Sequence, residues 1–157
     1  MSEKYFKIFI RVPTRQYTKK DSETTNIFSY QYLQSKLGIK KENSFDLFLI
    51  SVLVGKLFVD PDKIPNEITN TETYSRYSYV YDKPYISILK AIAVDEVGEI
   101  SILNDIPAMV KIWERYACAG FDELIKWYHD KTFTFESKLY EVLLEYYDKY
   151  QEKYHMD

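Results

Sequence analysis

The chain has 157 residues, 46% of them hydrophobic and 29% charged, so its length fits one domain with a core of its own and its composition excludes a disordered chain. Its single cysteine excludes an internal disulfide, whereas secreted domains of this size usually contain several. The formal net charge of −3 is unevenly distributed: residues 1–41 carry nine Lys and Arg against three acids, and residues 42–157 carry twelve against twenty-one. We therefore expect a basic N-terminal arm on an acidic body.

The sequence also argues against a membrane or export segment. Its longest apolar stretch, residues 47–54, is interrupted by Ser51 and is far shorter than the roughly 18 residues that a membrane span needs. Residues 1–11 alternate between polar and apolar types instead of forming an apolar leader. We expect a cytoplasmic protein that does not contact a membrane.

The N-terminal third predicts one strand and one short helix. Residues 4–12 alternate strictly and are rich in Ile, Val and Phe, which predicts a strand that ends at Pro13. The following residues, 14–26, are polar and basic, and we expect a loop there. Residues 27–37 predict a short helix that ends at Gly38.

The rest of the chain predicts a helical body. Ser44 is the expected N-cap of a helix that is apolar nearly all round, which is typical of a buried central helix. Gly98 and Gly120 are expected to end two later helices, and Asp105 to cap the start of one. A second strand near 74–81 could pair with the first. The six predicted helices span about residues 27–37, 44–58, 84–97, 105–119, 121–129 and 136–153.

These elements predict a mainly α fold: a single compact domain, 1–157, of about six helices with a small two-stranded β element near the N-terminus. Residues 1–43 would form the basic strand, arm and first helix, 44–130 the helical core and 131–157 the C-terminal helix. Helical spacing places six residues in one buried cluster: Phe48, Leu49, Val52, Leu89, Ile92 and Trp113.

The N-terminal strand carries the candidate binding residues. Tyr5, Lys7, Phe9 and Arg11 would share one exposed face, with apolar residues behind it. Aromatic rings and cations in alternation can stack bases and bind phosphates of single-stranded nucleic acid. The same pattern is also typical of a plain edge strand or of an edge that docks a protein. Further cations could extend the positive surface: Arg15, Lys19, Lys20, Lys40 and Lys41.

The sequence indicates no catalytic residues, no metal site and no cofactor. His129 and His155 are far apart, and no paired Cys or His spacing typical of zinc sites occurs. Cys118 is expected to be a buried small side chain at a helix end, where the helix dipole disfavours a thiolate. Asp95, Glu96 and Glu99 could do acid–base chemistry, but solvated acids at a helix end give the same pattern.

The order of motifs in residues 45–130 resembles a known family. An FDLF start leads into an apolar helix ending at Gly55, followed by KAIAVDEVGEISIL at 90–103 and ERYACAGFDEL at 114–124. This resembles the small accessory proteins encoded beside bacterial DNA sulfur-modification (phosphorothioation, Dnd) gene clusters. The resemblance implies a protein that works in or near antiviral DNA defence by contacting other proteins, and it carries over no catalytic residue.

From this we expect a non-enzymatic accessory or interaction protein associated with DNA modification or antiphage defence, with one or more protein partners. Two alternatives remain open. The chain could bind nucleic acid through the N-terminal strand and arm, or it could be a small regulator that forms a homo-oligomer through its C-terminal helix.

Overall fold

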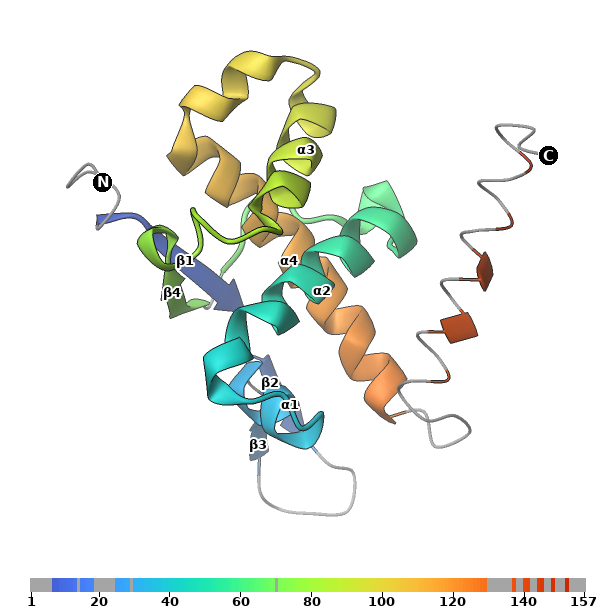
Figure 1. The fold of residues 1–157 in the computed structure, drawn as a ribbon. Helices are drawn as coiled ribbons and strands as arrows, with labels where there is room; N and C mark the ends of the chain where they lie inside the picture. The colour runs from blue at the N-terminus through green and yellow to red at the C-terminus, as the bar shows by residue number, and fades with distance from the viewer. Residues whose placement is uncertain are drawn as a thin grey trace.

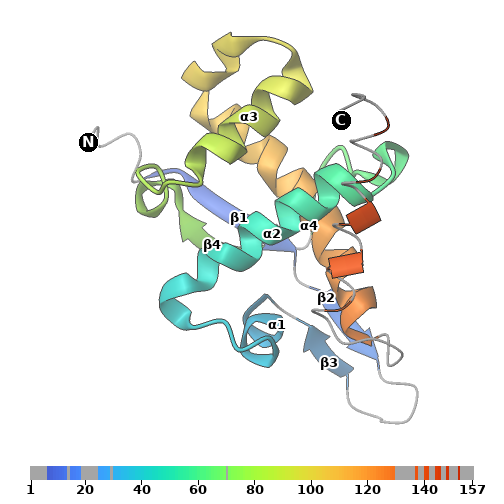
Figure 2. The ribbon, with the colours of Figure 1, turned by 45° about the vertical axis from the view of Figure 1, so that its right-hand side comes forward.

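The structure, a computed structural model, describes residues 7–13, 15–18, 25–28, 30–69 and 71–129, and seven single helical residues in the C-terminal segment. Among the described residues the elements follow one another as strands β1 (Phe9–Pro13), β2 (Arg15–Thr18) and β3 (Thr25–Phe28), helices α1 (Tyr30–Lys36) and α2 (Ser44–Phe58), strand β4 (Thr71–Arg76), and helices α3 (Ile86–Val97) and α4 (Ile106–His129). Helices α2 and α4 cross at the centre, with α3 beyond one end of the crossing and α1 with β2 and β3 beyond the other (Figures 1 and 2).

The crossing of α2 and α4 depends on two glycines. A Cβ atom on Gly120 would lie far inside contact distance of the backbone carbonyl oxygen of Ser51, and one on Gly55 would meet the carbonyl oxygen of Tyr116 in the same way. Only hydrogen fits at either position, so the two backbones approach more closely than any side chain would allow. The hydroxyl of Ser51 turns back to its own helix and donates to the Leu47 carbonyl at 2.7 Å.

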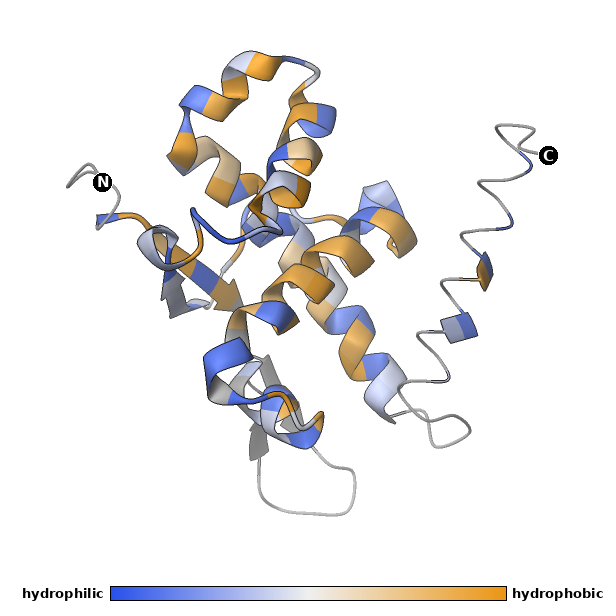
Figure 3. Cartoon of the chain, viewed as in Figure 1, coloured by the Kyte–Doolittle hydropathy of each residue, from blue (hydrophilic) through white to orange (hydrophobic). Residues whose placement is uncertain are grey.

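Helix α2 is the central helix that its composition predicts. Its apolar residues extend along most of its length (Figure 3), and Leu47, Phe48 and Val52 are fully buried. The helix begins at Ser44 and ends at Phe58, as expected. Its N-cap, however, is Asn43, and no side chain caps it, so the expectation for Ser44 as the N-cap was wrong.

The core gathers around Trp113 of α4. Its ring is fully buried, and its indole N–H donates to the Leu89 carbonyl of α3 at 2.7 Å, which satisfies the one polar atom of the ring. Phe48, Val52, Leu89 and Ile92 lie in the same buried cluster, and Leu49 packs against it while partly exposed. The predicted core is therefore confirmed, with Leu49 at its margin.

The β structure consists of two antiparallel pairs, β1 with β4 and β2 with β3. The pairing of β1 with β4 confirms the predicted two-stranded element. In its register Ile10 lies opposite Ser75 and Arg11 opposite Thr73, so Tyr74 is the extra residue of a bulge. The Tyr74 ring then packs between the rings of Tyr30 and Phe48, with centroids at 5.3 and 6.3 Å. Through this bulge the sheet is attached to the helical core.

Several predicted bounds were wrong. The expected loop at 14–26 contains β2 and the start of β3, and the helix expected from residue 27 begins at Tyr30. The second strand lies at 71–76 instead of 74–81, because residues 77–79 form a 3₁₀ turn that buries Tyr77 and Ser78. Gly38 and Gly98 do follow helices with positive φ, at 70° and 78°.

The predicted break at Gly120 is the largest error. Residues 106–129 form one continuous helix, because Gly120 provides the close contact with α2 instead of a helix end. Asp105 caps this helix as expected, its carboxylate accepting the Ala108 N–H at 3.1 Å. The described residues thus contain four α-helices rather than six.

Most of the predicted C-terminal helix, 136–153, lies outside the described residues. The few residues of this segment that the structure describes, such as Tyr140 and Leu144, are helical and exposed. None of the described helices is long and apolar enough to cross a bilayer.

Replacing Trp113 with Ala tests the core. We expect the free energy of unfolding to fall by about 3–5 kcal/mol, because a large cavity adds to the lost transfer energy. The measurement is a urea titration followed by circular dichroism. Tyr79→Ala is the control, since Tyr79 is 62% exposed and its removal should change stability by no more than about 0.5 kcal/mol. A loss below about 1 kcal/mol for Trp113→Ala would contradict the core described above.

Candidate functional site

The outer face of the β1–β4 sheet is basic and aromatic. The side chains of Lys7 and Arg11 are exposed, and Phe9 between them is 42% exposed. Ile10 and Val12 are fully buried behind them. Arg76 of β4 lies opposite Phe9 and holds its guanidinium 5.2 Å from the centre of the ring. Lys7 lies two residues before β1, outside the paired strands. We call Phe9, Arg11 and Arg76, together with the neighbouring Lys7, the basic–aromatic face.

The structure brings together only some of the predicted site residues. The strand predicted at 4–12 is confirmed over residues 9–12, where exposed Phe9 and Arg11 alternate with buried Ile10 and Val12, but Lys7 and Ile8 precede β1 and Ile8 is only partly buried. Arg15 is on β2, opposite Phe28, and so belongs to the other sheet. Tyr5, Lys19 and Lys20 lie outside the described residues. Arg76 was missed, because it is distant in sequence and only the strand register places it beside Phe9.

The inner side of β1 meets a buried carboxyl group that the sequence did not single out. Glu114 of α4 is 7% exposed, and its Oε2 accepts the backbone N–H of Arg11 at 2.5 Å. Burial raises the pKa of Glu114 from its ordinary value to about 7, against the opposing effects of the Arg11 N–H, the Arg11 side chain and Lys111. Glu114 therefore exchanges its proton near neutral pH.

Glu114 lines a pocket between α4 and the connection that precedes β4. The pocket has a volume of about 320 Å³. Six residues line it: Asn66, Glu67, Ile68, Lys111, Glu114 and Arg115. A cavity with a buried titratable carboxyl group is the kind of place where ligands bind and chemistry occurs, so this is the second candidate site.

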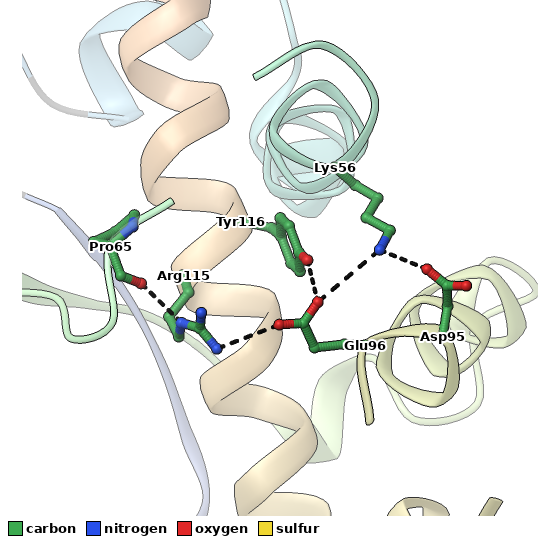
Figure 4. Close-up of polar contacts among 6 residues, drawn as sticks. All are labelled: Lys56, Pro65, Asp95, Glu96, Arg115 and Tyr116. Atoms are coloured by element: carbon green, nitrogen blue, oxygen red, sulfur yellow. Dashed lines mark hydrogen bonds and ion pairs between the residues drawn. The ribbon is translucent and has the colours of Figure 1, made fainter. Parts of the chain in front are cut away.

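A polar cluster joins α2, α3 and α4 (Figure 4). It shares Arg115 with the pocket. Lys56 lies 2.6 Å from the Asp95 carboxylate and 4.0 Å from that of Glu96. The hydroxyl of Tyr116 donates to Glu96, and Arg115 approaches the other oxygen of Glu96 at 3.7 Å. Asp95 and Glu96 are two of the three acids for which the sequence left a catalytic role open.

The contacts of the cluster favour a structural role for these acids. Burial raises the pKa of the Tyr116 hydroxyl, and its hydrogen bond to Glu96 adds to the effect. Desolvation alone would lower the pKa of Lys56, but Asp95 and Tyr116 together raise it, so its ammonium is held in the charged form. The cluster thus fastens the end of α3 to α2 and α4, and Glu99 remains exposed outside it.

Other chemistry finds little support among the described residues. Cys118 is buried, as expected for a small side chain, but it lies inside the continuous helix α4 and not at the helix end that the sequence predicted. Within the described parts of the chain, no three His, Cys, Asp or Glu side chains lie close enough to hold a metal ion.

Comparison with known proteins adds no further indication. No protein-family model, no curated protein and no solved structure matches this chain. The resemblance of residues 45–130 to the accessory proteins of DNA sulfur modification therefore stays a prediction.

Glu114→Gln tests the buried carboxyl group. Because the pKa is about 7 in the folded state and 4.5 in the reference state, the folded state binds the proton more tightly, and stability falls as pH rises between these values. Glutamine keeps an oxygen for the Arg11 N–H without the buried charge. We expect the variant to be more stable than the native protein by roughly 2–3 kcal/mol at pH 8.

The measurement is the free energy of unfolding at several pH values. The difference between the two proteins should shrink towards zero as pH falls below about 4.5, where both side chains are neutral. Glu67→Gln is the matched control, because Glu67 lines the same pocket but is exposed. A difference that does not vary with pH would contradict the raised pKa.

Proposed function

We propose that the protein works by binding a partner rather than by catalysis, and that the basic–aromatic face is its docking surface. The observation that carries this proposal is the composition of that face. Lys7, Arg11 and Arg76 contribute three positive charges around one exposed aromatic ring, and the register adds only Thr73 between them, with no acid. Arginine and aromatic side chains are enriched among the residues that dominate binding energy at protein interfaces.

The partner that fits this face best is an acidic segment of another protein. Carboxylates can pair with Arg11 and Arg76 through their planar guanidinium groups, with two hydrogen bonds each. Arg76 already covers one part of the Phe9 ring, and the exposed remainder can make apolar contact with the partner. Charge complementarity of this kind also speeds association.

Single-stranded nucleic acid is the second candidate. The observation in its favour is that Phe9 is 42% exposed and lies between Lys7 and Arg11, because base stacking on a ring beside phosphate-binding cations is how such strands are bound. The overall charge of −3 speaks against a large phosphate-binding surface.

The biological setting in DNA modification or antiphage defence rests on the sequence resemblance of residues 45–130 alone. It is tested by the genes that flank this one, since sulfur-modification genes beside it would support the proposal at once. A gene neighbourhood without them in several related genomes would count against it.

The two partner classes are separated by titrating the full chain with a labelled mixed-sequence oligonucleotide and with a labelled acidic peptide, each at low and at physiological salt. We expect the acidic peptide to bind and the oligonucleotide to show no binding even at low salt. Oligonucleotide binding that weakens steeply as salt rises would overturn this, because that dependence reports the release of counterions from phosphates.

Matched variants locate the surface. Arg11→Ala combined with Arg76→Ala should abolish peptide binding, and Phe9→Ala should weaken it by about 1–3 kcal/mol as an interface anchor. Lys126→Ala is the control, because the Lys126 side chain is 71% exposed on the far half of α4. Equal losses in the control and in the double variant would show that only overall charge matters, and would contradict a defined docking face.

A further inference from the structure

The pocket beside Glu114 is separate from the basic–aromatic face, because none of the residues of that face lines it. One wall is formed by Lys111, Glu114 and Arg115 on successive turns of α4, and the other by residues 66–68 of the connection before β4. Its volume of about 320 Å³ is at the lower end for ligand pockets, which suits a metabolite of amino-acid size better than a nucleotide.

Glu114 provides an acceptor inside the pocket. One carboxylate oxygen is occupied by the Arg11 N–H, and the structure gives the other no hydrogen bond within the described residues. That second oxygen is not fully buried, so a group in the pocket can reach it. An ammonium group of a ligand would supply the missing charge and donors.

Two basic side chains, Lys111 and Arg115, lie on the same wall of the pocket as Glu114. Lys111 is exposed and makes no ion pair within the described residues, so its ammonium group is available to a ligand. Arg115 is held in place: its Nε donates to the Pro65 carbonyl at 2.8 Å, and its Nη1 faces Glu96 at 3.7 Å (Figure 4). The remaining donors of that fixed guanidinium can bind a carboxylate.

The lining therefore has two acids, Glu67 and Glu114, and two bases, Lys111 and Arg115. A purely cationic ligand would be repelled by the two bases, and a purely anionic ligand would be repelled by the buried carboxylate of Glu114. We propose that the pocket binds a small zwitterion of the amino-acid type, with its ammonium group on Glu114 and its carboxylate on Lys111 and Arg115.

Binding of such a ligand is linked to pH. The ammonium group favours the charged form of Glu114, so binding should release a proton where Glu114 is protonated in the free protein. The charged groups that act on Glu114 are Arg11 of β1 and Lys111 of α4, and Glu67 and Arg115 line the same pocket. Affinity should rise about tenfold between pH 6 and pH 8, as Glu114 with a pKa of about 7 loses its proton.

The experiment is an NMR titration of the full chain at pH 8 with pools that together contain all the common amino acids, at millimolar concentration. We expect at least one pool to shift the backbone signals of Lys111, Glu114 and Arg115, and the active amino acid is then identified singly. No shift with any pool would overturn the proposal.

Two matched analogues of the active amino acid test the zwitterion requirement, namely its decarboxylated amine and its deaminated acid. Both should bind at least about tenfold more weakly, since each leaves one charged partner unpaired. Equal binding of the amine would show a simple cation site and would overturn the proposal.

Variants assign the two halves of the site. Glu114→Gln should abolish binding. Lys111→Ala should weaken binding and move its pH dependence to higher pH, because Lys111 is one of the cations that lower the pKa of Glu114. Lys126→Ala is the control and should bind as the native protein does. Because the free energies of unfolding of these variants are measured in parallel, a loss of binding can be distinguished from a loss of the fold. Unchanged affinity in folded Glu114→Gln would also overturn the proposal.

Discussion

Helices α2 and α4 touch backbone to backbone where Gly55 and Gly120 meet, and the other elements are arranged around this contact. A Cβ atom at either glycine would collide with a carbonyl oxygen of the opposite helix, so the two helices approach as closely as they do only because neither position has a side chain. Tyr30 of α1 is placed by the same region of α4: its ring stacks on Phe121 at 4.0 Å and its hydroxyl donates to the Ala117 carbonyl at 3.0 Å. The crossing therefore fixes α1 as well as α2.

Four consecutive residues of α4 then serve four different parts of the molecule. Trp113 fills the core and donates a hydrogen bond to α3, and Glu114 accepts one from the backbone of β1. Arg115 lines the pocket and donates to the connection before β4, and Tyr116 donates to Glu96 in the polar cluster. Because successive side chains on a helix point in directions about 100° apart, one turn can reach all of these neighbours. The orientation of α4 is set by the glycine contact, so the basic–aromatic face and the pocket both depend on it.

Sequence patterns within single elements were sufficient to predict the features that depend only on neighbouring residues. The strict alternation of residues 9–12 was sufficient to predict an exposed and a buried face of β1, and the apolar run of α2 was sufficient to predict a central helix. Gly120 could not be interpreted in this way, because a glycine in an apolar helix is equally compatible with a helix end and with a close contact. The signal that was available is on α2, where the two small residues Ser51 and Gly55 lie four positions apart and leave room for the backbone of another helix. The partners of the site were hidden for a different reason: Glu114 is 103 residues from Arg11, and only the fold brings them together.

The free energy of unfolding of Gly120→Ala tests the account most directly, since it asks whether the helix crossing is as close as described. In an ordinary helix interior this substitution is stabilising by up to about 1 kcal/mol, because alanine has the higher helix propensity. Here the added methyl group would collide with the Ser51 carbonyl, and we expect a loss of about 3 kcal/mol, the upper end of the range for overpacked cores. Gly55→Ala should behave in the same way. A stabilised Gly120→Ala variant would show that the two helices are not in backbone contact and would contradict the account.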